Sequence, residues 1–274
     1  MDKTHIADIE LDLLLEGVYR RWGYDFRQYA RGSLRRRVGL ACEELGAGTM
    51  AELQHRVLHE RASFDRLALS LSVSVTELFR DPGFFRAMRE TVLPLLASYP
   101  FIKVWHAGCA TGEEVYSMAI LFDEAGLLDR TTFYGTDFNS ASLDTARDGI
   151  YPLEQLEKSA ESYTAAGGQR RLAGYAATAH ASARFNKRLR DRIVFSLHNL
   201  AVDGVFSEIH LVVCRNVLIY FNNELKERVV DLFAGALVPF GVLALGGKES
   251  LGVTPADRHF KVLDAPHRLY RKEG

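Results

Sequence analysis

Cysteine, long apolar runs and net charge are all scarce in this chain of 274 residues. The three cysteines, Cys42, Cys109 and Cys214, lie far apart and form no CxxC pair, which excludes a disulfide framework and gives no zinc-ligand pattern. No stretch approaches the roughly 20 apolar residues of a membrane span, and the acidic, interrupted N-terminus does not resemble a signal peptide. A formal net charge of −1 gives no overall argument for binding to nucleic acid or to a membrane surface. We therefore expect a soluble protein of the reducing cytoplasm.

The N-terminal quarter of the chain has the pattern of helices. Its apolar residues recur at helical spacing, and Gly23 is placed to end the first helix. Ser33 and Thr49 are candidate N-caps for two later helices. No segment in this part shows the period-2 alternation of a strand. We predict an all-helical domain over residues 1–73, followed by a linker and a helix over residues 74–100.

From residue 101 onward, short apolar runs alternate with amphipathic stretches. This order predicts βαβ units in a doubly wound α/β domain over residues 101–274, with ligands at the carboxyl ends of the strands. Residues 152–193 are too long for a plain connection and contain a turn signal and a weak hairpin pattern, so we expect a small inserted β-subdomain there. The last apolar run, "HRLYR" (267–271), is a candidate edge strand.

The first strand of this domain runs into "AGCATGEE" (107–114). Gly108 and Gly112 allow the backbone to approach a ligand closely. Glu113 and Glu114 occupy the first helical turn, where they would repel a phosphate but suit a ligand that is cationic or rich in hydroxyls and amines. The turn matches neither GxGxxG nor the lysine-containing phosphate loop. The alternative is that both acids only complement the helix dipole.

The next strand, "TTFYGTD", ends at Asp137, where dinucleotide folds hold the ribose hydroxyls of adenosine. Asp137 could instead cap the following helix, although Asn139 and Ser140 can also do so. The glycine turn and this acid together indicate a nucleoside without phosphates, and S-adenosylmethionine is the obvious cofactor of that kind. A nicotinamide dehydrogenase is disfavoured by the missing GxGxxG.

A later buried strand, "LVVC", ends in polar side chains. Arg215 and Asn216 follow it directly, and Tyr220 comes shortly afterwards. Buried polar groups need partners, and the crevice at the switch point of a doubly wound sheet can supply them. A structural role is the usual alternative for such a pair.

Five segments of the chain resemble motifs of the chemotaxis receptor methyltransferase family, CheR, in the same order and spacing. They are "SVTELFRDPGFF", "AGCATGEEVYS", "GTDFNSASLDTARDGIY", "HNL" and "CRNVLIYF", and "GYDFRQYARGSLRRRV" resembles the family's first helical segment. The resemblance implies an N-terminal helical domain and an S-adenosylmethionine-dependent methyltransferase domain with a small inserted β-subdomain. It also implies methyl transfer to glutamate side chains of receptor cytoplasmic helices, which gives γ-carboxyl methyl esters and S-adenosylhomocysteine. A different acceptor, or a non-catalytic cofactor-sensing module, is the alternative.

The resemblance also implies site residues. It places cofactor contacts on Thr76, Arg80, Glu113, Asp137, Asn199, Leu200, Arg215 and Asn216, and we add Ser74, Gly108 and Gly112. Arg80 and Tyr220 are the implied active-site side chains near the transferred methyl. Ser74 stands where the family often has asparagine, Val115 replaces a usual proline, and "GGKE" (246–249) replaces "GHSE".

The implied reaction needs no general base, because a glutamate carboxylate with a pKa near ~4.3 is already ionised at neutral pH. Arg80 could hold either the acceptor carboxylate or that of the cofactor. Residues 20–37 carry a basic run with Asp25 as its one acid, and the resemblance supports docking of an acidic receptor helix on Arg31, Arg35, Arg36 and Arg37. The alternative is that this basic helical face is only exposed to solvent, and nucleic acid is disfavoured as its partner. We expect no metal, no membrane insertion and a monomer.

Overall fold

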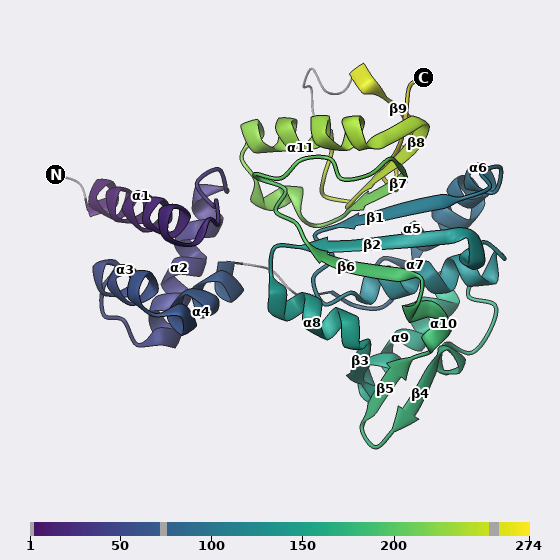
Figure 1. Ribbon diagram of the computed structural model, residues 1–274, viewed down its shortest axis with the longest axis horizontal. Coiled ribbons are helices and arrows are strands. Elements are labelled where there is room, and N and C mark those ends of the chain that lie inside the picture. Colours follow the sequence, from purple (N-terminus) through teal and green to yellow (C-terminus); the bar gives the residue numbers. More distant parts are fainter. Residues whose placement is uncertain (1–2, 72–75, 252–257) are drawn as a thin grey trace. The chain divides into compact units, whose positions relative to one another are not determined.

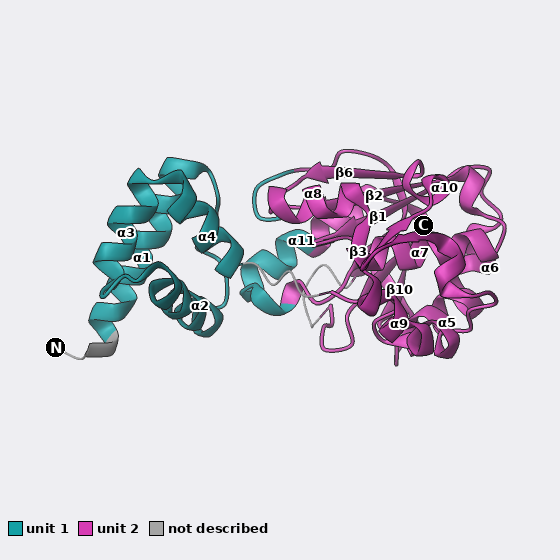
Figure 2. Cartoon of the chain, turned by 90° about the horizontal axis from the view of Figure 1, so that it is seen from below, with its two compact units in different colours: residues 1–74, 199–203, 219–229 teal, residues 75–198, 204–218, 230–274 magenta. Residues whose placement is uncertain are grey.

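The computed structural model describes residues 3–71, 76–251 and 258–274 (Figure 1). The chain divides into two compact units, which Figure 2 shows in different colours. Unit 1 comprises residues 1–74, 199–203 and 219–229, and unit 2 comprises residues 75–198, 204–218 and 230–274. Unit 1 therefore combines the N-terminal part of the chain with two short segments from much later in the sequence. Among the described residues, no helix is long and apolar enough to cross a membrane.

Unit 1 is built mainly from helices: α1 (Lys3–Trp22), α2 (Arg31–Leu45), α3 (Met50–His59) and α4 (Arg61–Leu71). Their apolar faces form a common core, in which Trp22 stacks on Phe64 with ring centroids 4.9 Å apart. Thr49 caps α3 as predicted, because its side chain accepts the N–H of Glu52. The predicted cap at Ser33 is wrong, since α2 already begins two residues before it.

A second contact explains where α2 begins. The segment before it pairs with residues 219–222, which belong to the same unit. The N–H of Ala30 donates to the carbonyl of Tyr220 at 2.7 Å, and the N–H of Asn222 donates to the carbonyl of Gln28 at 2.8 Å. Backbone pairing with a distant segment thus supports the start of α2, which has no side-chain cap.

Unit 2 contains a seven-stranded sheet in the order β6-β2-β1-β7-β8-β10-β9. The strands are β1 (Ile102–Ala107), β2 (Thr131–Asp137), β6 (Ile193–Leu197), β7 (Ile209–Cys214), β8 (Leu237–Leu245), β9 (Phe260–Asp264) and β10 (Leu269–Lys272). The neighbouring strands β6, β2, β1, β7 and β8 are parallel to one another, and β10 is antiparallel to both of its neighbours, β8 and β9. The predicted edge position of "HRLYR" is therefore wrong, because β9 pairs with β10 and occupies the edge.

Helices cover both faces of this sheet (Figure 1). The helical segments are α5 (Pro82–Ala87), a π-helical turn (Met88–Val92), α6 (Leu93–Leu96), α7 (Glu113–Glu124), α8 (Ser140–Asp148) and α11 (Asn223–Ala236), of which residues 230–236 belong to unit 2, with 3-10 turns at Leu128–Arg130 and Leu218–Tyr220. Successive residues of a strand point to opposite faces. Trp105 contacts Phe233 of α11, whereas Phe133, on the opposite face, contacts Phe122 of α7. The central strands are buried on both sides, as their continuous apolar runs predict.

A small subdomain lies within unit 2, between α8 and β6. It contains β3 (Ile150–Pro152), α9 (Leu153–Ala165), a 3-10 turn (Leu172–Tyr175), β4 (Ala176–Ala179), β5 (Ser182–Phe185) and α10 (Lys187–Arg190). Its three strands form an antiparallel sheet in the order β3-β5-β4. The predicted small β-subdomain and its hairpin are confirmed, and its first strand begins two residues before the expected start. Phe185 anchors it by stacking on Tyr116 of α7 at 4.5 Å.

Candidate functional site

The turn between β1 and α7 has the close backbone approach that its glycines predict. Gly108, Ala110 and Gly112 have φ values of 77°, 48° and 92°, in the left-handed region. A Cβ on Gly108 would lie 2.5 Å from Cγ2 of Val217, and one on Gly112 would lie 2.9 Å from Cβ of Ala146. Both glycines are therefore required by conformation and by space, at the carboxyl end of β1.

Asp137 closes this turn from the neighbouring strand. Its Oδ2 accepts the N–H of Ala110 and its Oδ1 accepts the N–H of Asn139, both at 2.9 Å. Asn139 itself caps α8, because its side chain accepts the N–H groups of Ala141 and Ser142, so Asp137 is not the cap. Burial raises the pKa of Asp137 above its ordinary value, although the backbone donors oppose this. An ionised carboxylate has about four acceptor sites, so the backbone donors Ala110, Phe138 and Asn139 leave one for a ligand hydroxyl.

Glu113 begins α7 with a buried side chain. Its two oxygens accept hydrogen bonds from Thr111 Oγ1 at 2.6 Å and from Gln155 Nε2 at 3.1 Å. Burial raises the pKa of Glu113. Both donors are neutral, so they orient the carboxylate without cancelling its charge. Thr111 and Gln155 were not predicted from the sequence, and Gln155 comes from the inserted subdomain.

Glu114 is held differently, by an ion pair with Arg215. The guanidinium of Arg215 lies 2.7 Å from Glu114 and 2.6 Å from Asp81, and it also lies over the ring of Phe84 at 3.9 Å. The side chain of Arg215 is only 2% exposed, that of Glu114 18% and that of Asp81 57%. Burial would raise the pKa of Glu114, but the charge of Arg215 and a contact with His106 lower it to about 2. Two carboxylates thus neutralise the buried cation.

Arg215 also connects the predicted active-site segment to α7. Asp81 has a φ of 60° and directly follows Arg80, which is exposed. The N–H of Phe79 donates to Ser117 Oγ of α7 at 2.9 Å, so a second bond holds the same segment. Thr76, at the start of the segment, is half-buried, and the predicted contact Ser74 lies outside the described residues. Asp81 was not predicted from the sequence.

Asn216 adopts a left-handed conformation, with φ 62°, in the turn after β7. A single buried carboxylate holds this turn. Glu249 accepts the N–H groups of Asn216 at 2.9 Å, of Val217 at 2.8 Å and of Gly246 at 2.6 Å. Glu249 is the last residue of "GGKE" (246–249). Its role was not predicted, and the only hint in the sequence is that an acid follows so soon after a buried strand.

Of the predicted cofactor and active-site residues that the structure describes, Asn199, Leu200 and Tyr220 belong to unit 1. Leu200 is buried, and Asn199 Oδ1 accepts the N–H of Ala201 at 3.0 Å, which orders its own turn. The ring of Tyr220 lies 5.2 Å from the guanidinium of Arg37. The remaining predicted residues between Thr76 and Asn216 belong to unit 2.

The basic run of unit 1 is paired with acids of α1. Arg31 contacts Asp12 at 2.5 Å, and Arg35 forms an ion pair with Asp8. Arg36 is exposed. Acids outside the run also oppose it, because residues four apart on α1 lie on one face and present their carboxylates together. All four side chains of these two ion pairs are at least a third exposed.

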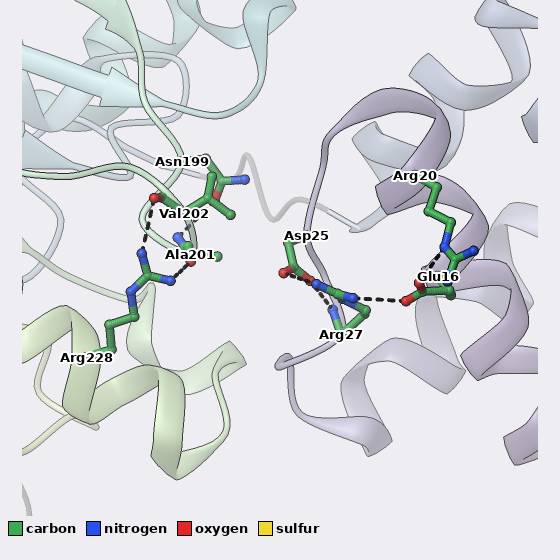
Figure 3. Close-up of polar contacts among 8 residues, drawn as sticks. All are labelled: Glu16, Arg20, Asp25, Arg27, Asn199, Ala201, Val202 and Arg228. Carbon is green, nitrogen blue, oxygen red and sulfur yellow. Dashed lines mark hydrogen bonds and ion pairs between the residues drawn. The ribbon is translucent and has the colours of Figure 1, made fainter.

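Unit 1 also contains a polar cavity of about 490 Å³. Figure 3 shows the contacts around it: Arg228 donates to the carbonyls of Ala201 and Val202, and Arg27 reaches both Asp25 and Glu16. Its lining residues are Tyr19, Asp25, Arg27, Gln28, Ala201, Val202 and Arg228. The two guanidinium groups are thus bonded to carboxylates or carbonyls of the same unit.

The sequence matches two family models in order. Residues 9–72 match the CheR methyltransferase all-alpha domain, and residues 74–269 match the CheR methyltransferase SAM binding domain. The chain belongs to the CheR methyltransferase family. The predicted resemblance, the S-adenosylmethionine-dependent methyltransferase fold and the cofactor are thereby confirmed, and the CheR chain is an enzyme of methyl transfer.

Relatives of this CheR chain match it over most of their length. It is 48% identical to Cher3 of Pseudomonas putida over 272 residues, which cover 99% of this chain and 100% of Cher3. It is 30% identical to a chemotaxis protein methyltransferase of Listeria monocytogenes, over 92% of this chain and 94% of that protein. It is 28% identical to chemotaxis protein methyltransferase 2 of Pseudomonas aeruginosa, over 90% and 88% of the two chains.

The geometry of the CheR turn suits this cofactor. S-adenosylmethionine carries an adenosine, a cationic sulfonium and an ammonium group, but no phosphate. The turn brings together the carboxylates of Glu113 and Asp137, and the guanidinium of Arg215 is already paired with two acids. A phosphate would meet carboxylates there, whereas hydroxyl and cationic groups would find acceptors.

Proposed function

We propose that this chain transfers the methyl group of S-adenosylmethionine to glutamate side chains of a chemoreceptor-type protein, giving γ-glutamyl methyl esters in the cytoplasm. The observation that carries this proposal is the match to both CheR domains in their family order. The relatives in Listeria monocytogenes and Pseudomonas aeruginosa are named as chemotaxis protein methyltransferases, which supports the same acceptor class. A methyltransferase with another acceptor is the second candidate.

The cofactor-binding residues follow from the turn. Asp137 accepts a ribose hydroxyl, since its carboxylate keeps an acceptor site beyond its three backbone donors. Glu113 carries a buried negative charge that its neutral donors do not cancel, so it receives the cationic end. Gly108 and Gly112 give the backbone room for close approach. The bound cofactor supplies an electrophilic methyl group on a sulfonium.

The acceptor is held by residues of this chain rather than activated by a base. A glutamate carboxylate is ionised at neutral pH, so the chain must orient it at about 3–3.5 Å and exclude water. We assign Arg80 to the acceptor carboxylate, because it is exposed, whereas the nearby Arg215 is buried between two acids. Tyr220 is the second side chain assigned to the reacting groups.

The receptor docks on the basic run of α2. Exposed ion pairs such as Arg31–Asp12 and Arg35–Asp8 contribute little stability, so an acidic helix can replace the α1 carboxylates at small cost. Arg36 is exposed on the same helix. Receptor methylation should therefore fall steeply as ionic strength rises, whereas S-adenosylhomocysteine affinity should barely change. A parallel loss of both would contradict charge-based docking.

The decisive experiment uses a purified chemoreceptor cytoplasmic domain and S-adenosylmethionine labelled in its methyl group. We expect incorporated label that alkali releases as methanol, as an ester requires, and no incorporation when the acceptor glutamates are changed to alanine. Alkali-stable label would favour the second candidate. Calorimetry with S-adenosylhomocysteine tests the pocket: Asp137→Ala should weaken binding strongly, whereas Asp144→Ala, at an exposed acid of α8, should not.

A further inference from the structure

Three backbone N–H groups converge on the carboxylate of Glu249, which is 4% exposed. Two of them, from Asn216 and Val217, belong to the turn after β7, and the third, from Gly246, belongs to the turn after β8. These strands are parallel neighbours, and their carboxyl ends lie at the same edge of the sheet. Glu249 therefore ties two adjacent loops together at the edge where the glycine turn lies.

The carboxylate compensates for an unfavourable turn. Asn216 has a left-handed backbone, which asparagine adopts more readily than most residues but which still costs free energy relative to the right-handed region. Hydrogen bonds to a charged acceptor are stronger than neutral ones. A glutamine at position 249 would offer one acceptor oxygen and would turn its own N–H donors toward backbone donors. It could not replace all three bonds.

The turn held by Glu249 carries two features of the site. Its first residue is Arg215, whose guanidinium contacts Glu114 and Asp81. Its third residue is Val217, against which the backbone of Gly108 packs so closely that a Cβ would clash. A shift of this turn would move both the Arg215 ion pairs and the wall of the glycine turn.

We propose that Glu249 is a positioning residue for the cofactor site. It holds the turn after β7 in the conformation in which Arg215 bridges α7 and the segment that carries Arg80. It does not touch the reacting groups itself and acts through Arg215 and Val217. This inference rests on the proposed function for its turnover readout, but its binding readout is independent of the acceptor.

Calorimetry with S-adenosylhomocysteine on Glu249→Gln tests the proposal. We expect affinity to fall about ten- to hundred-fold, the range expected when a charge-assisted bond is lost. Glu249→Asp keeps the charge and should retain more affinity than the glutamine variant. The matched control is Glu124→Gln, at the opposite end of α7. Glu124 is a fully buried carboxylate that accepts bonds from Arg89, Tyr163 and the N–H of Gln169, so its loss should lower stability without changing affinity.

A double-mutant cycle tests the path of the effect. Asp81→Asn removes the exposed end of the Arg215 bridge and should lower affinity severalfold. If Glu249 acts through Arg215, the losses of Glu249→Gln and Asp81→Asn should be less than additive in the double variant. Additive losses, or equal losses in Glu249→Gln and Glu124→Gln, would overturn the proposal. Should Glu249→Gln not fold, Glu249→Asp replaces it in the cycle.

The two proposals fail in different ways. A wild-type chain that binds S-adenosylhomocysteine but does not methylate a chemoreceptor domain would overturn the acceptor assignment and leave the Glu249 measurements valid. A receptor-methylating chain in which Glu249→Gln binds as tightly as the wild type would overturn the role of Glu249 alone. With the receptor domain present, the KM for S-adenosylmethionine should rise in Glu249→Gln by about the same factor as the loss of affinity.

Discussion

Replacing Arg215 with methionine should strongly destabilise unit 2, because it leaves the Glu114 carboxylate without its charge partner. The guanidinium is 2% exposed and Glu114 is 18% exposed, so water can only partly compensate for the loss. Asp81, the other partner, is 57% exposed and can be solvated when the cation is removed. The cost should therefore come almost entirely from Glu114.

Two independent arguments give the magnitude. Removing one partner of a buried ion pair typically costs about 3–5 kcal/mol. Its environment lowers the pKa of Glu114 from the ordinary 4.5 to about 2. At about 1.4 kcal/mol per pKa unit, this shift corresponds to roughly 3 kcal/mol in favour of the charged form. We expect Arg215→Met to reduce the free energy of unfolding by about 3 kcal/mol at neutral pH.

The same pKa sets the pH dependence. A carboxyl group whose pKa is lowered by folding stabilises the protein above its unfolded pKa, and this contribution is lost as pH falls through the folded pKa. The contribution of Glu114 is complete above about pH 4.5 and disappears toward pH 2. The stability difference between the wild type and Arg215→Met should therefore shrink over that window. At neutral pH, adding Glu114→Gln to Arg215→Met should recover part of the loss.

Tryptophan fluorescence can report unit 2 alone. The chain has two tryptophans, and Trp22 lies in unit 1 whereas Trp105 is fully buried in unit 2. A Trp22→Phe background leaves Trp105 as the single reporter during urea unfolding. An unchanged midpoint in Arg215→Met, or a stability difference that does not depend on pH below 4.5, would refute the reasoning.

Three further predictions concern the site itself. Gly108→Ala should weaken S-adenosylhomocysteine binding at least tenfold in calorimetry, because its Cβ would lie 2.5 Å from Val217 on a backbone with φ 77°; wild-type affinity would contradict the geometry. As the pH is lowered, cofactor affinity should begin to decrease at a pH above the ordinary pKa of Glu113, because burial raises that pKa and protonation removes the charge; the decrease should be smaller in Glu113→Gln. Arg80→Ala should reduce the single-turnover rate far more than Tyr220→Phe, and equal small losses would reverse the assigned roles.

Short-range features of this protein were predictable from its sequence. The run "TTFYGTD" coincides with β2, the hairpin of β4 and β5 lies inside its predicted segment, and Thr49 caps α3. The segment "AGCATGEEVYS" (107–117) by itself predicted a glycine turn followed by a helix with two acids in its first turn. Each of these has a local signal in the sequence: apolar patterning for the strand, a turn signal for the hairpin, a side-chain cap for α3 and two glycines for the turn.

Long-range pairing decided the rest. The side chain of Arg215 pairs with Asp81 and Glu114, which lie 134 and 101 residues away in the sequence. Glu249 accepts the N–H groups of Asn216 and Val217, and Gln155 donates to Glu113. These partners lie more than 30 residues away, and no local pattern indicated them. The contacts of Glu249 with the turn after β7 exist because β7 and β8 are parallel neighbours whose carboxyl ends lie at one edge of the sheet.

The corrected predictions have the same physical origin. Ser33 has the chemistry of an N-cap, yet α2 begins earlier, where backbone pairing with residues 219–222 supports its first turn. The run "HRLYR" has the composition of an edge strand, yet β9 pairs with it and occupies the edge of the sheet. The sequence did not indicate β9, because this short strand is partly exposed and gives only a weak strand pattern. Sequence by itself determined which residues form the turn and which chemistry it offers. Only the tertiary structure decided which carboxylates, guanidinium groups and backbone donors meet there, since those meetings depend on strand order and not on nearness in the chain.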